Sequence, residues 1–320
     1  MENAQDMTQI TQTIQSEISN AVIGQTQIVE QIIIALIASG HVLLEGVPGL
    51  GKTLMVQALA KTFNGDFSRI QFTPDLMPSD VTGHILYDMK SESFKVRKGP
   101  VFTNLLLADE INRAPAKTQA ALLEVMQEQQ VTLEGRSMAV GHPFMVLATQ
   151  NPIEQEGTYP LPEAQLDRFL FKILIDYPQD KEELALVQHT TDHKTGDKLD
   201  VSRVASCVQP ETILKLQKQA AVLQVDEQVV QYAVNVARST RSWNGIAIGS
   251  GPRGGIALIR AARARAVMHG RDYITPDDIK EVTLPAMRHR IVLSPEMELE
   301  GMHSDRILEN ILDKVPAPRH

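Results

Sequence analysis

Apolar and polar residues alternate differently in the two parts of this chain. Five short apolar runs in the first part read as fully buried strands: residues 41–45, 69–72, 104–108, 144–148 and 171–175. Helical patterns separate several of these runs, notably at residues 52–63 and 116–129. Strands buried on both faces and alternating with helices are typical of a parallel sheet covered by helices on each side. The first part is therefore predicted to be α/β, with a five-stranded parallel sheet.

Two further helices are predicted before the first strand. Ile10, Ile14 and Ile18 are spaced four residues apart, which places them on one face of a short amphipathic helix. Residues 28–38 are almost continuously apolar and read as a second helix, mostly buried.

The strand signal ends near residue 177. The segments that follow have helical patterns, and several begin with Asp or Pro, as helices often do: residues 180–191, 210–220, 226–239, 252–268 and 276–288. The change of pattern predicts two domains, an α/β domain over residues 1–177 and an all-α domain over residues 178–320.

Two segments that resemble β-hairpins interrupt the α/β plan. The first places residues 84–87 against residues 94–97 across a polar turn, and the second places residues 131–133 against residues 138–140. Surface decoration and functional inserts are both compatible with this pattern, and spacing alone does not choose between them.

Composition and charge narrow the class of protein. The chain is 43% hydrophobic and only 4% aromatic, which is ordinary for a mixed α/β protein. Its net charge of −8 argues against a general nucleic-acid-binding surface.

The single cysteine, Cys207, excludes an intramolecular disulfide and fits a reducing compartment. The N-terminus lacks the layout of a secretory signal, and the longest apolar run, residues 32–38, is too short to span a membrane. We therefore expect a soluble, cytoplasmic protein.

The strongest chemical signal is a glycine-rich loop between the first strand and the helix at residues 52–63. Eight consecutive residues match the pattern G-x-x-x-x-G-K-[ST]: Gly46, Val47, Pro48, Gly49, Leu50, Gly51, Lys52 and Thr53, with Leu54 directly after them. Glycines let backbone N–H groups wrap phosphates, and the helix N-terminus adds its dipole. Lys52 would reach the β- and γ-phosphates, and the Thr53 hydroxyl would bind Mg²⁺. The loop predicts ATP and Mg²⁺ as cofactors.

Two carboxylates follow the third predicted strand. Asp109 and Glu110 come directly after an apolar run, at the sheet edge where ligands bind in open α/β folds. Asp109 would hold Mg²⁺ through its water shell, and Glu110 would orient and deprotonate the attacking water. The motif is weak alone, and it gains weight because it follows a phosphate-binding loop.

Three further polar residues are candidates with open alternatives. Asn151 follows a buried strand and could bond the γ-phosphate or the lytic water, or merely end the strand in an Asn-Pro turn. Arg168 could be an arginine finger or form a salt bridge with Asp167. Arg253 opens a helix and could reach the γ-phosphate. The same helix carries three further arginines, which could form a solvated or subunit-facing basic surface: Arg260, Arg263 and Arg265.

Taken in order, five motifs resemble the MoxR family of AAA+ ATPases: GVPGLGKT, LLLADEINRAP, LATQNP, LPEAQLDRF and GPRGG. The resemblance covers nearly the whole chain and implies an AAA+ P-loop core followed by a helical lid. It assigns Lys52 and Thr53 to Walker A, Asp109 and Glu110 to Walker B, and Asn151 to sensor 1. It makes Arg168 a finger that acts on a neighbour's ATP, and Arg253 sensor 2.

Further expectations come from the same resemblance. The hairpins resemble the helix-2 and pre-sensor-1 inserts of this clade, and Ile23 and Gly24 belong to a segment that borders adenine. The family generally forms hexameric rings that act as chaperone-like machines on protein partners, often with von Willebrand factor A domains, in complex maturation or metal insertion. The lid of this clade can be displaced, so Arg253 acts either in cis or in trans, and Arg113 is a further interface candidate.

Three functions compete at this point. An ATP-driven remodeller of protein partners fits the negative charge best. A DNA-acting AAA+ motor would need clustered basic residues on the hairpins, where Lys95, Arg97, Lys98 and Arg136 are sparse. A GTP-dependent switch lacks an N-K-x-D guanine motif and ranks last.

Overall fold

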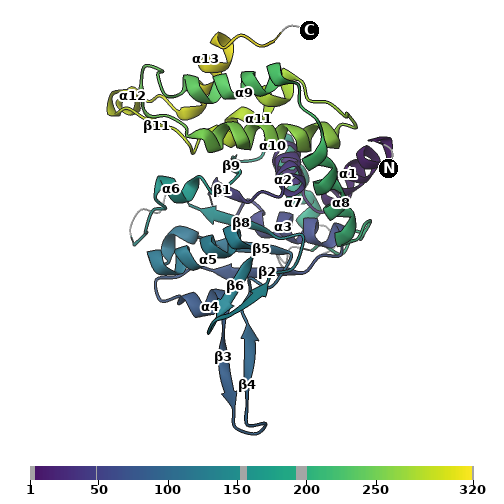
Figure 1. Ribbon diagram of the computed structural model, residues 1–320. Helices are drawn as coiled ribbons and strands as arrows, with labels where there is room; N and C mark the ends of the chain where they lie inside the picture. Colours follow the sequence, from purple (N-terminus) through teal and green to yellow (C-terminus); the bar gives the residue numbers. More distant parts are fainter. Residues whose placement is uncertain (1–3, 48, 152–156, 192–199, 319–320) are drawn as a thin grey trace.

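A computed structural model of the chain describes residues 4–47, 49–151, 157–191 and 200–318. The molecule has three tiers, which Figure 1 shows from top to bottom. The helices that follow residue 226 form the upper tier, a sheet with its flanking helices forms the middle one, and a two-stranded hairpin projects downward.

The middle tier is built on a five-stranded sheet whose neighbouring strands are all parallel. The strand order is β2 (Phe67–Gln71), β5 (Leu105–Asp109), β8 (Met145–Gln150), β1 (Val42–Gly46) and β9 (Phe171–Ile175). The prediction of a five-stranded parallel α/β sheet is confirmed, with β2 beginning two residues earlier than expected. Because all strands run the same way, their carboxyl ends meet at one edge, where a ligand can be bound.

Helices cover both faces of the sheet, and successive strand residues alternate between them. Leu44 packs in the core formed with α2 (Thr26–Ile37) and α3 (Lys52–Thr62), whereas Leu43 packs in the core formed with α5 (Ala116–Glu128). The central strands β5 and β8 are therefore apolar along most of their length, which explains why they could be read as continuous apolar runs, whereas β2 at the sheet edge carries Ser68, Arg69 and Gln71.

Both predicted hairpins are present. In the first, β3 (Gly83–Asp88) pairs with β4 (Ser93–Lys98), and this hairpin projects from the body (Figure 1). In the second, β6 (Gln130–Leu133) pairs with β7 (Arg136–Ala139) across a two-residue turn. The long hairpin leaves large apolar side chains exposed near its tip: Tyr87, Met89 and Phe94.

The C-terminal part is helical, as predicted, apart from a small antiparallel pair, β10 (Ile246–Ile248) with β11 (Val292–Leu293). Its helices are α7 (Asp180–Thr191), α8 (Pro210–Val222), α9 (Glu227–Ser239), α10 (Pro252–Met268), α11 (Pro276–Met287), α12 (Pro295–Leu299) and α13 (Ser304–Lys314). The last two of these helices were not predicted from the sequence. Three short elements of the middle tier were not predicted either: α4 (Pro78–Thr82), η1 (Ile111–Arg113) and α6 (Glu163–Leu166).

One apolar core runs from the sheet into the C-terminal helices. α10 packs against α8, α9 and α11, and also against α2 and the N-terminal helix α1 (Ala4–Ser19). Buried residues of these helices belong to a single cluster. The boundary between residues 177 and 178 therefore stays a prediction, because packing is continuous across it. None of the described helices combines the length and apolar character that crossing a membrane requires.

Candidate active site

The glycine-rich loop connects the carboxyl end of β1 to the first turn of α3, as its sequence predicts. Gly49 and Gly51 have φ angles of 87° and 74°, which other residues rarely adopt, and a Cβ at either would meet nothing within 4 Å. Gly46 is required for another reason, since a Cβ there would lie 2.5 Å from the carbonyl oxygen of Ile175. The loop therefore keeps open backbone next to a helix N-terminus, where phosphates bind. Pro48 lies outside the described residues.

Lys52 begins α3 and points back into the loop. Its Nζ donates to the carbonyl oxygen of Gly46 at 2.5 Å. Burial lowers the pKa of Lys52, and the nearby charges of Asp109, Glu110 and Glu45 oppose that shift. The ammonium group is thus half-buried among three carboxylates, where it can bind an anion that enters the loop. Thr53 and the buried Leu54 follow in the same helical turn.

Asp109 ends β5 and is held by two neighbouring strands. Thr149 of β8 donates from its hydroxyl to Asp109 Oδ1 at 2.6 Å, and Arg69 of β2 forms an ion pair with Oδ2 at 2.6 Å. Both partners are oriented by the sheet, so the carboxylate is fixed at the edge that faces the loop.

Glu110 adopts a left-handed backbone conformation, with φ of 55° and ψ of 50°. Such a conformation is strained for a non-glycine residue and is enriched at functional sites. Its amide donates to the Thr149 hydroxyl at 2.9 Å. Gln71 Nε2 and Arg113 Nη1 donate to the same carboxylate oxygen, Oε2, at 2.6 and 3.0 Å. The carboxylate is therefore held by two side chains at the edge of the sheet.

These side chains line one pocket at the carboxyl ends of β1, β2, β5 and β8. The structure brings together eight residues that the sequence predicted as functional, three of which are loop glycines: Gly46, Gly49, Gly51, Lys52, Thr53, Asp109, Glu110 and Asn151. Four more pocket residues were not anticipated: Arg69, Gln71, Thr149 and Gln150. A usable signal existed, because Gln71 is the last residue of β2 and pairs in register with Asp109. Polar residues at the ends of neighbouring strands could have been assigned to the same edge.

The segment expected to border adenine lies beside the loop. Gln25 donates from Nε2 to the carbonyl oxygen of Leu50 at 3.3 Å. The preceding Gly24 has a φ angle of 70°, and a Cβ there would lie 2.8 Å from the carboxyl carbon of Glu182 on α7. Gly24 and Gln25 thus link this segment to α7 and to the loop, and Ile23 directly precedes them in the chain.

The oxygen donors of this pocket suit Mg²⁺. Hard oxygen ligands and retained waters are what Mg²⁺ prefers, and it usually binds through one or two protein groups plus phosphate oxygens. Thr53 and Asp109 supply such oxygens. In the part of the chain that the structure describes, no group of three or more His, Cys, Asp or Glu side chains could hold a metal by itself. The pocket therefore fits a metal that arrives with a nucleotide.

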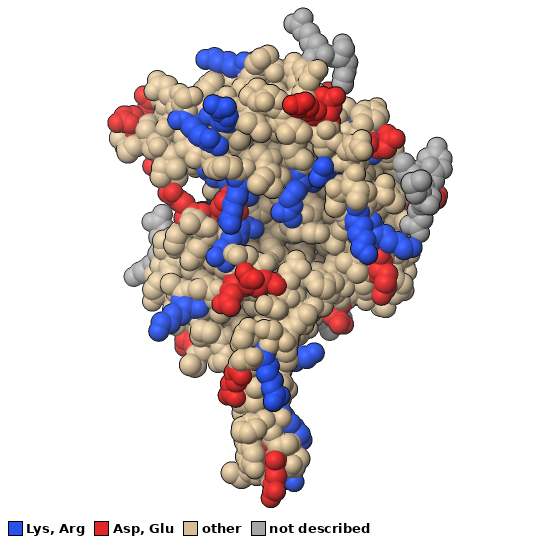
Figure 2. All heavy atoms as spheres, in the orientation of Figure 1, with Lys and Arg blue, Asp and Glu red and all other residues tan. Residues whose placement is uncertain are grey.

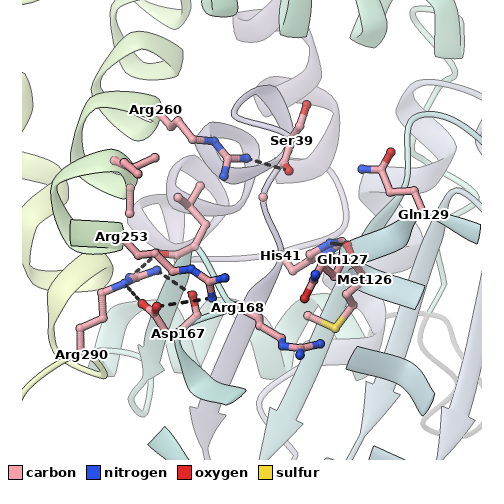
Figure 3. A pocket seen from close by; sticks show the side chains of 14 residues that line it. Ser39, His41, Met126, Gln127, Gln129, Asp167, Arg168, Arg253, Arg260 and Arg290 are labelled. Atoms are coloured by element: carbon pink, nitrogen blue, oxygen red, sulfur yellow. Dashed lines mark hydrogen bonds and ion pairs between the residues drawn. The ribbon is translucent and has the colours of Figure 1, made fainter. Parts of the chain in front are cut away.

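Arg168 and Arg253 do not line this pocket. They line a second one, which we call the arginine pocket, between the sheet tier and the C-terminal helices (Figure 3). Arg253 forms an ion pair with Asp167 at 3.6 Å, and Arg168 donates to the carbonyl oxygen of Leu123 at 2.7 Å. The proposed Arg168–Asp167 salt bridge is absent among the described residues, because Asp167 pairs with other arginines.

Arg290 connects two parts of the arginine pocket through contacts with Asp167 and Phe169. Its Nε lies 2.7 Å from Asp167 Oδ1, and its Nη2 donates to the carbonyl oxygen of Phe169 at 2.7 Å. Burial lowers the pKa of Arg290, and the charge of Asp167 opposes that shift. Arg290 follows α11, so this buried group fixes the segment that carries Arg168 to the C-terminal helices.

The three arginines that follow Arg253 on α10 have different surroundings. Arg265 donates to Asp278 Oδ1 at 2.5 Å, a buried structural contact. Arg260 caps the end of α2 by donating to the carbonyl oxygens of Ala38 and Ser39, and it lines the arginine pocket. Arg263 lies on the adjoining surface. Figure 2 shows basic side chains gathered around the hollow between the C-terminal helices and the sheet tier.

Comparisons with known proteins agree with this geometry. The model of the ATPase family associated with various cellular activities (AAA) matches residues 41–171, and the model of the AAA lid domain matches residues 238–311. A crystal structure of a candidate ATPase from Cytophaga hutchinsonii superposes with a TM-score of 0.91 at 42% identity, covering 99% of this chain and 97% of the other.

Curated relatives narrow the family further. Chaperone MoxR1 of Mycobacterium tuberculosis is 44% identical over 95% of this chain and 81% of its own length. Protein MoxR of Methylorubrum extorquens is 33% identical over 94% of this chain and 93% of its own length. The alternative of a DNA-acting motor gains no support from these relatives.

Proposed function

The chain belongs to the MoxR family of AAA+ ATPases, and we propose that it hydrolyses Mg²⁺-bound ATP at a site shared by two neighbouring subunits of a ring. One subunit contributes the pocket at the carboxyl ends of the strands, which we call the P-loop pocket. Its neighbour contributes Arg168 and Arg253. Members of the family generally form rings of six subunits, and we expect the same number here.

The separation of the two pockets carries this proposal. Phosphoryl transfer from ATP develops negative charge on the γ-phosphoryl group, and a cation supplied by an arginine finger is worth roughly 10³–10⁵ in rate. Lys52 and Arg69 are the cations that line the P-loop pocket among the described residues, and Arg69 is already paired with Asp109. Arg168 and Arg253 line a different pocket, which supports their action on a γ-phosphate bound by another copy of the chain.

The residues of the P-loop pocket have distinct tasks in the proposed reaction. Lys52 leaves the Gly46 carbonyl and binds the β- and γ-phosphates, while Asn151 bonds the γ-phosphate or the attacking water. Glu110 leaves Gln71 and Arg113 and accepts the proton of that water. Thr53 and Asp109 hold Mg²⁺, which neutralises charge on the β- and γ-phosphate oxygens when it is bound.

The partners of the ring are proposed to be proteins in the cytoplasm, remodelled in a chaperone-like way. A relative described as a chaperone supports this, as does the net charge of −8, which disfavours nucleic acid. The exposed Tyr87, Met89 and Phe94 on the projecting hairpin suit contact with a protein surface. Complex maturation or metal insertion, on partners with von Willebrand factor A domains, is the role that the family resemblance suggests.

A mixing experiment tests the shared site. Arg168→Ala and Lys52→Ala should each be nearly inactive alone, the first because it lacks the finger and the second because it cannot bind ATP. In a mixture, an Arg168→Ala subunit can bind ATP beside a Lys52→Ala subunit that still supplies Arg168. ATP hydrolysis should therefore return in the mixture and depend on the ratio of the two variants.

The control is a mixture of Arg168→Ala with a variant that lacks both Lys52 and Arg168. That mixture can assemble but offers no intact finger to any ATP, so it should stay inactive. If the first mixture assembles and hydrolyses no more ATP than its components, Arg168 does not act across the subunit boundary.

A further inference from the structure

An exposed apolar groove lies on the surface next to the arginine pocket. Val230 and Val234 of α9 are each 37% exposed, and Ile256 of α10 is 57% exposed. With Ile259 they line a groove of about 520 Å³ between these two helices. Exposed apolar surface in a hollow usually marks a docking site for another protein.

The rim of the groove is basic and lacks compensating charge. Arg238, Arg241, Arg260 and Arg263 all line it. Arg241 and Arg260 donate to backbone carbonyl oxygens, and none of the four pairs with a carboxylate within the described part of the chain. A docking segment should therefore have an apolar centre and acidic side chains around it, since opposite charges across an interface set its register.

The helix α7 of this same chain presents that combination. Asp180, Glu183, Leu184 and Val187 follow the spacing i, i+3, i+4, i+7, which places them on one face of the helix. This face points outward, because Leu184 and Val187 are 59% and 53% exposed and both acidic residues are exposed. It is an unpartnered face with an apolar centre and an acidic end.

The positions of α7 and the groove suit contact between copies of the chain. α7 lies against Gly24 through Glu182, on the side of the molecule that is expected to border the nucleotide. The groove shares Ile256 and Arg260 with the arginine pocket, on the side that is proposed to reach the next subunit's nucleotide. When two copies meet head to tail through these two sides, α7 of one copy approaches the groove of the other. Heterologous contacts of this kind form a ring when the rotation between subunits closes.

We propose that α7 of one subunit docks into the α9–α10 groove of its neighbour, with Leu184 and Val187 on the apolar floor and Asp180 and Glu183 against the arginines of the rim. The inference rests on the proposed function, because it assumes that the arginine pocket faces the neighbour's ATP. It goes further by naming two surfaces, α7 and the α9–α10 groove, through which neighbouring subunits contact each other next to the shared site.

The projecting hairpin, another exposed apolar element, matches the groove less well. The projecting hairpin carries Tyr87 and Phe94 near its tip, but the side chains around them are mostly basic: Lys90, Lys95, Arg97 and Lys98, against Asp88 and Glu92. Basic side chains on a basic rim would repel, so α7 is the favoured occupant.

Site-directed cross-linking tests the contact. In full-length protein with Cys207→Ser and Glu110→Gln, which should hold ATP without turnover, Val187→Cys is placed in one preparation and Val234→Cys in another. A short bismaleimide should cross-link a mixture of the two in the presence of Mg²⁺ and ATP, and neither preparation alone. The matched control replaces Val234→Cys by Val222→Cys, an equally simple change at a 70% exposed valine of α8, and should give little product.

A charge exchange gives a second measurement. Arg238→Glu and Glu183→Arg should each raise the protein concentration needed for half-maximal ATPase activity by roughly tenfold, because each replaces attraction with repulsion. The double variant should return toward the parent, since the pair is restored with its charges exchanged.

The outcomes separate this inference from the proposed function. If mixed Arg168→Ala and Lys52→Ala recover activity but V187C and V234C do not cross-link, the shared site stands and the docking of α7 is wrong. If the V234C thiol is as accessible to a small maleimide with ATP as without it, the groove stays open in the ring and serves another protein. Equal cross-linking to V222C also overturns the contact, as does failure of the double variant to recover.

Discussion

The two polar pockets of this molecule differ in the charge of the side chains that line them. The P-loop pocket contains Asp109 and Glu110 together with Lys52 and open glycine backbone, so it can hold phosphates and a water but has little positive charge to spare. The arginine pocket contains four arginines and one carboxylate, so its positive charge has little to neutralise. Each pocket lacks what the other has.

Under the proposed function, this difference means that the chain carries two halves of one site rather than two sites. Within the P-loop pocket, hydrogen bonds and ion pairs link neighbouring strands, as between Thr149 and Asp109. Within the arginine pocket, Arg290 links the segment of Arg168 to the C-terminal helices. Contacts thus hold the side chains of each half in place, and we propose that assembly of copies completes the chemistry. The predictions below test this division.

The largest effects should come from removing one cation of each pocket. Lys52→Ala should abolish ATP binding, because the loop loses its main cation. Arg168→Ala should bind ATP normally yet hydrolyse it roughly 10³–10⁵ times more slowly, the scale of an arginine finger. Nucleotide binding by fluorescence and turnover under saturating ATP measure the two properties separately. Weak ATP binding by Arg168→Ala would place that residue in the cis site and break the division.

A smaller loss is expected when the proposed base is neutralised. Glu110→Gln keeps the size of the side chain and its hydrogen bonding but cannot accept a proton, so turnover should fall by roughly 10²-fold or more. ATP should still bind, because the phosphates are held by the loop and Lys52. Glu281→Gln, an exposed change on α11, serves as the control and should leave turnover unchanged. Parental turnover in Glu110→Gln would mean that another residue is the base.

Variants of Arg253 test whether the C-terminal helices act on the ATP of their own subunit or on that of the neighbour. Its side chain lies in the arginine pocket and pairs with Asp167, which favours action in trans. Arg253→Ala should lower turnover by roughly tenfold or more, as loss of a charge-stabilising group does. Mixing it with Lys52→Ala should restore activity if Arg253 serves the neighbour's ATP. If Arg253 serves its own ATP, every subunit able to bind ATP lacks it, and the mixture stays as slow as Arg253→Ala alone.

The positions of the strands along the chain and the residues of the glycine-rich loop could be predicted, because each depends on a short stretch of consecutive residues. Continuous apolar runs gave the five strands, and the glycine pattern gave Lys52 and Thr53. The position of Arg168 outside the P-loop pocket could not be worked out from spacing, since it depends on how the segment before β9 packs under Arg290. Arg290 itself gave no signal, because a basic residue after a helix usually faces solvent.

Missed elements have physical reasons as well. α13 buries only Ile307, Leu308 and Ile311 among charged neighbours, so its apolar stripe is narrow. Gln71 was overlooked because the β2 strand was expected to extend beyond it to Phe72, which hid its position at the strand end. Sequence reasoning identified the residues that act within one segment, and it missed partners supplied by packing between segments.

Acid should also distinguish the two pockets. His41 lies in the wall of the arginine pocket, where its Nδ1 accepts from the Val146 amide and its Nε2 donates to the Met126 carbonyl oxygen, both at 3.0 Å. Burial and the charge of Arg260 lower its pKa from 6.5 to about 4, although the bond to Met126 opposes the shift. No histidine lines the described part of the P-loop pocket.

The sign of the effect follows from where protons bind. Between pH 6.5 and pH 4 the unfolded chain protonates this histidine and the folded chain does not, so the free energy of unfolding falls as the pH falls. The loss attributable to His41 should reach about 3 kcal/mol by pH 4. Chemical denaturation at a series of pH values measures it, and His41→Gln, which cannot titrate, should flatten the curve over this range. His289, whose pKa burial also lowers, and Asp278, in which burial opposes the shift but hydrogen bonds to Arg271 and Thr275 lower the pKa to about 2, remain in both proteins and contribute to the slope that is left. An unchanged slope in His41→Gln would show that His41 is not a buried neutral support of the arginine pocket.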